Sequence, residues 1–151
     1  MKKVILGATG SIGSSLAKKL VESGEQVHLV GRDEASLSEL ANELNSTFTT
    51  CDVLEENFSE KIINDLKDEQ VNGLAYCVGS IDLKPLKLTK KSDFMQSFNL
   101  NLVSATEIIK SLADNLKASK GSIVLFSTVA VQQGFPNHAI VSSAKGAVEG
   151  L

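Results

Sequence analysis

The sequence predicts an α/β fold in which a doubly wound parallel sheet is covered by helices on both faces. Three observations support this prediction. Strand-like apolar runs alternate with helical patterns, a glycine-rich turn joins the first strand to the first helix, and the run Val71–Val78 is mostly apolar. Such a run is typical of a parallel strand that is buried on both faces. Right-handed crossovers then predict the strand order 3-2-1-4-5.

Local signals define the first elements. The apolar run that ends at Leu6 is the first strand, and a helix over Ser11–Ser23 follows the glycine turn. The second strand is Gln26–Val30, and Asp33 has the position and chemistry of a cap for a second helix. The apolar side chains expected to face inward are Ile12, Leu16, Leu20 and Val21 on the first helix and Leu37, Leu40 and Leu44 on the second.

The same patterns continue along the chain. The remaining predicted elements are strand Thr47–Cys51, helix Glu56–Lys67, strand Val71–Val78, helix Lys91–Leu116, strand Ser122–Phe126 and a last helix from about His138. The third helix places Phe58, Ile62 and Leu66 on one side. Doubly wound folds commonly have six strands, and this sequence stops inside a helix without a stop signal. We therefore expect residues 1–151 to be one domain that is truncated before its sixth strand.

The glycine turn has the sequence Leu-Gly-Ala-Thr-Gly-Ser-Ile-Gly, with the spacing G-x-x-G-x-x-G. Gly7 allows a tight turn, Gly10 lets the backbone approach a pyrophosphate, and Gly13 lets the helix pack close to the strand. The free amide groups at the start of the helix then face the anion. We favour a dinucleotide site over a plain structural turn because a strand precedes the turn and a helix follows it. The turn residues expected to contact the dinucleotide are Gly7, Thr9, Gly10, Ser11, Ile12 and Gly13.

Composition and charge exclude several classes of partner. Hydrophobic residues make up 42% of the chain and charged residues 22%, as in ordinary globular proteins. A net charge of −3 gives no reason to expect nucleic acid or an anionic membrane as a partner. No apolar run is long enough to span a bilayer, and the start lacks the apolar core of a signal peptide. Cys51 and Cys77 fit no metal or redox spacing, so we expect two buried, reduced thiols, no metal and a cytoplasmic location.

The end of the second strand bears on the choice between NAD and NADP. The strand is followed by Gly31 and Arg32, with no carboxylate at the position that would bind ribose hydroxyls in an NAD site. Arg32 suits the 2′-phosphate of NADP, and we favour NADP over NAD and over a solvated surface charge. Asp33 could accept a hydrogen bond from a ribose, but capping is the better interpretation. Asp52, beyond the third strand, could contact an adenine amino group or cap the following turn, and the residues leave both readings open.

Several polar residues fall where catalysis would be expected. Thr128 and its neighbour Ser127 end the fifth strand and could offer a hydroxyl to a substrate carbonyl. Lys145 on the last helix could hold ribose hydroxyls or acidify a neighbouring hydroxyl. His138 is either a residue of the cap region or a proton donor, and His28 in mid-strand is most simply a packed or edge residue.

These segments, taken together, resemble the short-chain dehydrogenase/reductase family. They are LGATGSIG, GR after the second strand, CDV after the third, FNLNLVSA in the long helix, GSIVLFST, and SSAKGAVEGL. The resemblance implies an NAD(P)-dependent oxidoreductase that moves a hydride between the nicotinamide and a small-molecule carbonyl or alcohol. It also implies a homodimer or homotetramer. The roles that carry over are adenine contact for Asp52 with Val53, a kept glycine at Gly79, a water-holding Asn101 and the active-site Lys145.

Two departures from the family pattern matter. The family's Asn-Ala-Gly after the fourth strand is Cys77-Val78-Gly79 here, and the proton-donating Tyr is Val141. The family's serine falls on Thr128, and His138 lies one helical turn before Val141 as a tentative replacement donor. Three hypotheses remain: a reductase with an altered donor, a non-catalytic NADP-binding sensor or assembly module, and hydride transfer to a flavin- or quinone-like acceptor.

Overall fold

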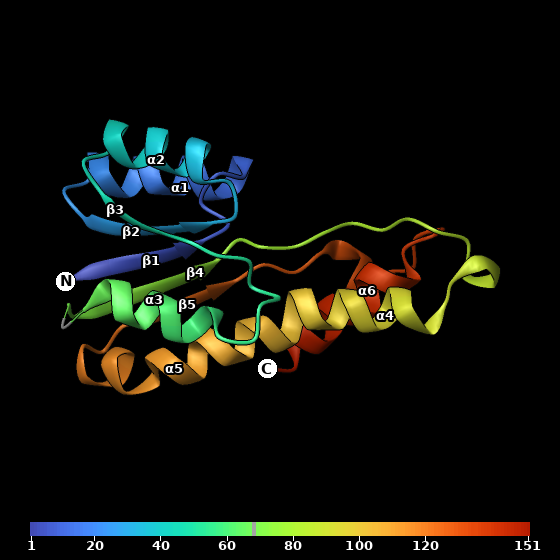
Figure 1. The fold of residues 1–151 in the computed structure, drawn as a ribbon. Helices are drawn as coiled ribbons and strands as arrows, with labels where there is room; N and C mark the ends of the chain where they lie inside the picture. Colours follow the sequence, from blue (N-terminus) through green and yellow to red (C-terminus); the bar gives the residue numbers. More distant parts are fainter. Residues whose placement is uncertain (68) are drawn as a thin grey trace.

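A five-stranded parallel sheet forms the centre of the protein and has helices on both faces (Figure 1). The computed structural model describes residues 1–67 and 69–151. The strands lie in the order β3-β2-β1-β4-β5, so the predicted order is confirmed. Their bounds are β1 Lys2–Leu6, β2 Gln26–Gly31, β3 Thr47–Thr50, β4 Val71–Tyr76 and β5 Ser122–Leu125.

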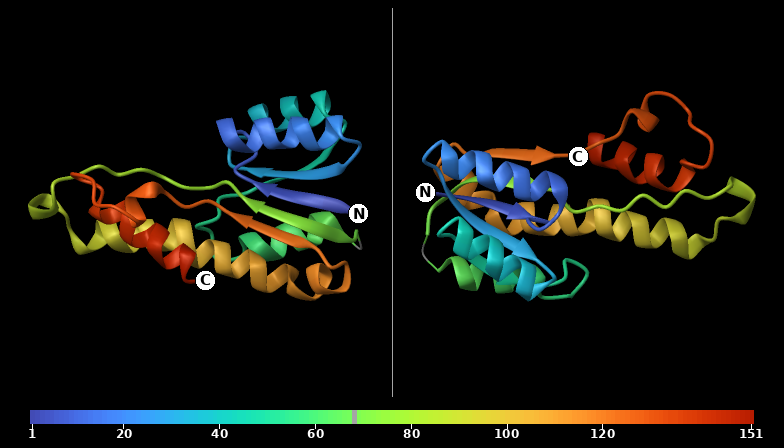
Figure 2. Two further views of the ribbon diagram at one scale, coloured as in Figure 1. Left: turned by 180° about the vertical axis from the view of Figure 1, so that it is seen from behind. Right: turned by 90° about the horizontal axis from the view of Figure 1, so that it is seen from above.

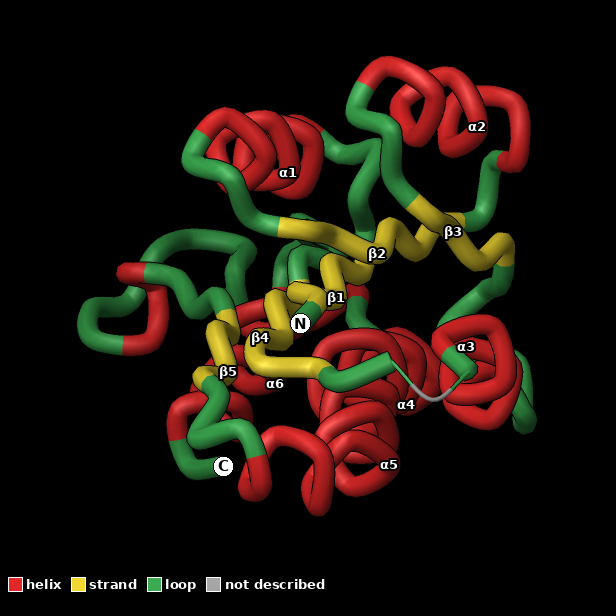
Figure 3. The backbone as a smooth tube through the Cα atoms, turned by 90° about the vertical axis from the view of Figure 1, so that its left-hand side faces the viewer, coloured by secondary structure: helices red, strands yellow, loops and turns green. Residues whose placement is uncertain are grey.

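The helices divide into two layers and an extension. Their bounds are α1 Ser11–Glu22, α2 Glu34–Glu43, α3 Phe58–Leu66, α4 Lys91–Phe98, α5 Ser104–Ala118 and α6 Ala139–Glu149. Seen along the strands, α1 and α2 cover one face of the sheet, and α3 and α5 cover the other (Figure 3). Helices α4 and α6 extend beyond the carboxyl ends of the strands (Figure 2). The predicted ends of these elements lie within two residues of the observed ends.

Two apolar layers hold the sheet, because successive side chains of a strand point to opposite faces. On β1, Val4 and Leu6 join the layer under α3 and α5, whereas Ile5 joins the layer under α1 and α2. All three side chains are fully buried. This is why residues 4–6 of β1 are apolar without alternation, as a central strand covered on both faces requires.

The predicted inward face of α1 is wrong at Ile12, whose side chain is 54% exposed. The buried residues of α1 are instead Gly13 and Ala17. Gly13 must face the sheet because it packs on the carbonyl of Gly7, and a residue one position earlier on a helix points about 100° away. Ile12 therefore faces solvent.

The long helix predicted over Lys91–Leu116 is not a regular α-helix throughout. A π-helical segment, Asn99–Val103, separates α4 from α5. In this segment the amide of Ser104 bonds the carbonyl of Asn99, five residues back, in place of the usual four. The apolar spacing on either side is helical, so periodicity alone predicts one uninterrupted helix.

Candidate dinucleotide site

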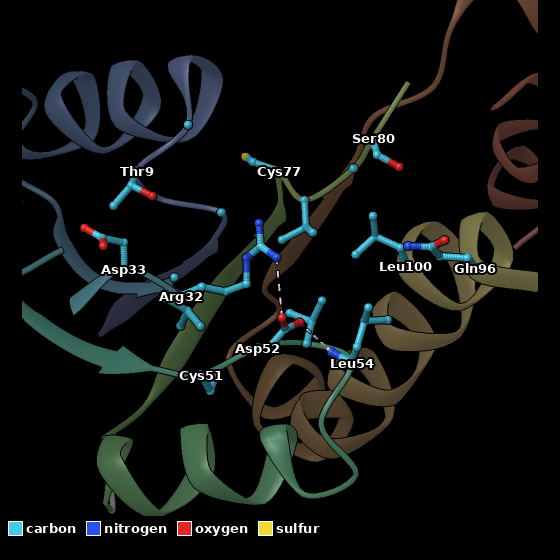
Figure 4. Close-up of a pocket in the computed structure, with 17 residues that line it drawn as sticks. Thr9, Arg32, Asp33, Cys51, Asp52, Leu54, Cys77, Ser80, Gln96 and Leu100 are labelled. Carbon is cyan, nitrogen blue, oxygen red and sulfur yellow. Dashed lines mark hydrogen bonds and ion pairs between the residues drawn. The ribbon is translucent and has the colours of Figure 1, made fainter. Parts of the chain in front are cut away.

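The functional edge of the sheet is the one at which all strands end. The register pairs Leu6 with Val30 and with Tyr76, and Gly31 with Thr50, so the loops that follow these strands lie side by side. These loops and α4 enclose a pocket of about 710 Å³ (Figure 4). Its lining includes seven of the predicted cofactor residues, namely Gly7, Thr9, Gly10, Arg32, Asp52, Val53 and Gly79. Ligands of open α/β sheets bind at such a switch in strand order, here between β1 and β4.

Geometry requires glycine at two of the three positions of the turn. Gly7 has φ +74°, and a Cβ there would stand 3.0 Å from the carbonyl group of Cys77. A Cβ on Gly13 would stand 2.2 Å from the carbonyl oxygen of Gly7, which no packing permits. Gly10 is less crowded, with 3.3 Å to the same oxygen, so protein packing alone does not explain its lack of a side chain.

The start of α1 is open to a ligand. Gly10 occupies the N-cap and has no side chain to accept a hydrogen bond, and the first turn holds no acidic residue. The first amide groups of a helix have no partner within the helix. Those of Ser11, Ile12 and Gly13 therefore keep their donors for an anion, although these three residues do not themselves line the pocket.

Asp33 caps α2, as expected. Its carboxylate accepts a hydrogen bond from the amide of Ser36 at 2.8 Å. The Ser36 side chain, and secondly the amide of Ser36, hold the pKa of Asp33 below its usual value. Asp33 also lines the pocket, on the side nearest Thr9 (Figure 4).

Arg32 and Asp52 face each other across the pocket (Figure 4). The Nη1 atom of Arg32 lies 3.5 Å from one oxygen of Asp52, and the other oxygen accepts the amide of Leu54 at 3.0 Å. The turn-capping role of Asp52 is thus observed, and one of its oxygens still faces the pocket. Arg32 is 76% exposed, so its side chain can turn toward a ligand at little cost.

Asn101 and Lys145 come from different helices and meet at Gly79. A Cβ on Gly79 would stand 3.0 Å from Oδ1 of Asn101 and 3.5 Å from Nζ of Lys145. Asn101 belongs to the π-helical segment and is only 1% exposed. Burial lowers the pKa of Lys145, because an ammonium loses hydration when it leaves water.

None of the four predicted catalytic residues, Asn101, Thr128, His138 and Lys145, is among the residues that line this pocket, although Asn101 and Lys145 adjoin it at Gly79. Thr128 accepts the amide of Ala130 at 3.3 Å, a bond that does not use its own hydroxyl proton. Nδ1 of His138 lies 2.7 Å from the carbonyl oxygen of Pro136 and must donate to it, since a carbonyl only accepts. Val141 is 4% exposed on α6.

Sequence reasoning missed part of the lining. The missed residues are Val30, Gly31, Asp33 as a lining residue, Cys51, Leu54, Cys77, Val78, Ser80, Gln96 and Leu100. Most of them directly adjoin a predicted strand end, so strand ends alone would have found them. Gln96 and Leu100 come from the helical segment over the pocket and carry no such signal. Cys51 is buried but Cys77 is only half-buried, against the expectation of two buried thiols. Burial raises the pKa of both thiols to about 11.

The fold and this pocket define a dinucleotide-binding α/β protein, with a glycine turn at an open helix start and a switch in strand order beside it. The family model for short chain dehydrogenase matches residues 2–151. The chain therefore belongs to the short-chain dehydrogenase/reductase family, and membership implies an NAD(P) cofactor. The chain is similar to L-fucose dehydrogenase of Oryctolagus cuniculus, with 30% identity over 98% of this chain and 54% of the relative. It is also similar to L-xylulose reductase of Bos taurus, with 30% identity over 99% of this chain and 62% of the relative.

Solved structures support the same fold. A short-chain type dehydrogenase/reductase from Mycobacterium ulcerans superposes with a TM-score of 0.90 at 20% identity, over 99% of this chain and 58% of the other. Serine dehydrogenase from Escherichia coli superposes with a TM-score of 0.91 at 19% identity, over 99% and 72%. The chain thus spans 54% and 62% of the two relatives named above. Among the described residues, no helix combines the length and apolar character needed to cross a bilayer.

Proposed function

We propose that this chain is the cofactor-binding part of an oxidoreductase that moves a hydride between NADP(H) and a small-molecule carbonyl or alcohol. The observation that carries the proposal is the open, uncapped start of α1 beneath a turn in which Gly7 and Gly13 can only be glycine. That arrangement presents amide donors to a pyrophosphate. A cytoplasmic location and a homodimer or homotetramer are further parts of the proposal.

The exposed guanidinium of Arg32 supports NADP over NAD. The guanidinium contacts the carboxylate of Asp52 at 3.5 Å, which is a long and solvated contact. A phosphate could replace it with charge-assisted hydrogen bonds. Asp33, the nearest carboxylate in sequence, is engaged with the amide of Ser36 at 2.8 Å. The end of β2 therefore offers an exposed cation, held only by a long contact to Asp52, for a 2′-phosphate, and the carboxylate beside it, Asp33, is already engaged as a helix cap.

The bound cofactor would supply the hydride, and the protein would orient the reactants and handle a proton. The ammonium of Lys145, beside Gly79, suits a cation that holds ribose hydroxyls and, through its charge, eases the loss of a neighbouring proton. The hydroxyl proton of Thr128 suits a hydrogen bond to a substrate carbonyl. In neutral His138, Nδ1 carries the proton and Nε2 is an acceptor, so His138 donates from Nε2 only as an imidazolium.

Val141 favours a second candidate function. A valine cannot donate a proton where the resemblance places a tyrosine, and loss of a general acid costs about two to four powers of ten in rate. The alternative is a non-catalytic NADP-binding sensor or assembly module. The two candidates differ in turnover, not in cofactor binding.

Calorimetric titration with NADPH and NADH tests the cofactor proposal. We expect the Arg32→Ala variant to lose about tenfold or more in NADPH affinity, since a charge-assisted contact is worth about 1.5–3 kcal/mol. Its NADH affinity should stay within about twofold. Lys18→Ala is the matched control, because Lys18 pairs with Glu43 on the surface away from the pocket. Equal losses for both nucleotides, or no binding at all, would overturn the assignment.

A turnover assay separates the two candidate functions. NADPH oxidation is followed with a carbonyl panel that includes L-xylulose, and NADP reduction with L-fucose, because the named relatives act on these sugars. Flavin and quinone acceptors are run beside them. Steady turnover that falls in Lys145→Ala and His138→Ala supports the oxidoreductase. Binding without turnover, with activity appearing only in Val141→Tyr, supports the non-catalytic module.

A further inference from the structure

Tyr76, the only tyrosine in the chain, is buried at the end of β4 and touches the π-helical segment. Its hydroxyl donates a hydrogen bond of 2.6 Å to the carbonyl oxygen of Leu100. In a regular α-helix that oxygen would accept the amide of Ser104. Here the amide of Ser104 bonds Asn99 instead, so the phenol takes an acceptor that the π turn releases.

A second side chain, that of Ser104, also holds this segment. The hydroxyl of Ser104 lies 2.9 Å from the carbonyl oxygen of Asn99 and 2.8 Å from that of Val53. Val53 lies in the loop after β3 and lines the pocket. Two hydrogen bonds therefore join the π turn to the edge of the sheet that carries the pocket. Tyr76 links it to the end of β4, and Ser104 links it to the loop after β3.

The π turn contains Asn101, whose carboxamide is fixed at one end only. Its amide nitrogen donates to the carbonyl oxygen of Ser97 at 2.9 Å. Its Oδ1 has no hydrogen-bond partner among residues 1–67 and 69–151, although it is fully buried. An unpaired buried acceptor costs about 1–3 kcal/mol, so a fold does not keep one without a compensating constraint. That oxygen faces the same side of Gly79 as the ammonium of Lys145.

We propose that Tyr76 is a positioning residue of the site: its hydroxyl holds the π turn and so keeps Oδ1 of Asn101 directed at Gly79 and Lys145. The role of the site in turnover rests on the proposed function, whereas the clamp itself does not. Tyr76 cannot act as an acid or base here, because burial raises its pKa well above the usual range and its proton is engaged. Its effect must pass through Leu100 and Asn101.

Tyr76→Phe removes the hydroxyl and keeps the ring. Thr106→Val is the matched control, because the Thr106 hydroxyl also donates to a carbonyl of the π segment, that of Leu102 at 2.9 Å, but on the exposed side. We expect hydrogen exchange at the Ser104 amide and the Asn101 carboxamide to accelerate about tenfold or more in Tyr76→Phe and to stay unchanged in Thr106→Val. Exchange in the strands should not change in either variant.

The kinetic readout is a split between kcat and KM. If the protein turns over NADPH, kcat should fall about tenfold or more in Tyr76→Phe, since small misplacements of a reacting group are costly, while KM for NADPH stays within about twofold. Unchanged exchange and unchanged kcat would overturn the proposal, and so would exchange that rises equally across the sheet. If no variant turns over, local acceleration at residues 99–104 upholds the clamp and only the proposed oxidoreductase activity fails.

Discussion

Gly13 packs against the glycine turn so closely that any side chain there would meet the backbone of Gly7 at 2.2 Å. Because the obstacle is backbone, a substitution has to move α1 away from β1. Gly146 in α6 offers the opposite case, since a Cβ there would meet only Cγ1 of Val131 at an ordinary 3.6 Å.

We expect Gly13→Ala to lower the free energy of unfolding by about 3 kcal/mol, as overpacking does, and to abolish dinucleotide binding. Gly146→Ala should instead raise it by about 0.5–1 kcal/mol, because alanine is the better helix former. Urea denaturation measures both values. Equal stability of the two variants would contradict the close approach of α1 to the turn.

His28 lies in a chain of hydrogen bonds whose direction follows from its two ends. The Asp65 carboxylate can only accept, so the Thr49 hydroxyl donates to it at 2.7 Å and must accept from Nε2 of His28 at 2.9 Å. The Lys2 ammonium can only donate, so it donates to the Thr47 hydroxyl at 2.9 Å, and that hydroxyl donates to Nδ1 at 2.8 Å. Neutral His28 therefore carries its proton on Nε2.

Protonation of His28 would break this chain. Burial, and secondly the charge of Lys2, lower the pKa of His28 to about 4, against the partial opposition of Asp65 and Glu69. In the unfolded chain His28 titrates near 6.5, so below that pH the unfolded state binds a proton that the folded state excludes. Stability present above pH 6.5 is then lost as the pH falls toward 4.

We expect the free energy of unfolding to drop by about 2 kcal/mol through His28 alone between pH 7 and pH 5. His28→Gln cannot titrate and retains one donor and one acceptor, so its stability should change less over this interval. Denaturation curves at a series of pH values give the difference. Parallel profiles for the two proteins would show that His28 titrates normally in the fold.

At the scale of elements, the start of α2 depends on one side chain. Asp33 is the N-cap and bonds the amide of Ser36, whereas α1 and α6 have no side-chain cap. The start of α2 is closed by its cap, whereas the start of α1 has no side-chain cap and is open to the pocket. The start of α1 is therefore a candidate anion site, and the start of α2 is not.

Asp33→Ala should destabilise the protein by about 1 kcal/mol, and Asp33→Asn, an equally good cap, should not. Thermal or urea unfolding of the pair measures this difference. Dinucleotide affinity should be the same in both variants. A fall in affinity in Asp33→Ala without loss of stability would reassign this carboxylate to the ribose.

The helical stretch over residues 91–118 differs between the prediction and the structure. Spacing of apolar residues indicates helix on both sides of Asn99–Val103, and helix is what forms. At this break the segment bonds groups outside the helix: the Tyr76 hydroxyl of β4 donates to the carbonyl of Leu100, and the carbonyl of Val53, in the loop after β3, accepts the Ser104 hydroxyl. A local pattern cannot report on hydrogen bonds to residues so distant in the chain.

At the scale of the whole molecule, the pocket is built from segments that lie far apart in the sequence. Its lining comes from the loops after β1, β2, β3 and β4 and from the helical segment over them. A ligand that contacts all of these binds the folded state and not the unfolded one. Binding and stability are then linked.

We expect free NADPH at about 100 times its Kd to raise the free energy of unfolding by about 2.7 kcal/mol. The melting temperature should rise with NADPH concentration in the parent protein and in Lys18→Ala. Arg32→Ala should melt at the same temperature as the parent without ligand, since its ion pair is exposed, but should need more NADPH for the same rise. A melting temperature independent of NADPH would rule out the pocket as the cofactor site.

Much of the site was accessible from the sequence because its signals are local. Gly7, Arg32, Asp52 and Gly79 each come within three residues of the end of a strand, and parallel strands bring their carboxyl ends to one edge. The roles predicted for Asn101, Thr128, Lys145 and His138 stay predictions. All four lie outside the pocket lining, but the structure brings Asn101 and Lys145 together at Gly79, which does line it.

The sequence by itself determined which segments are strands and helices, the strand order, and the glycine turn, because periodicity, glycine and capping residues act on their immediate neighbours. Only the tertiary structure decided which distant side chains meet. The phenol of Tyr76 on the carbonyl of Leu100, His28 between Thr47 and Thr49, and Ile12 in solvent all depend on register and helix rotation. Register and rotation are set by the packing of all elements at once, and no short stretch of sequence encodes them.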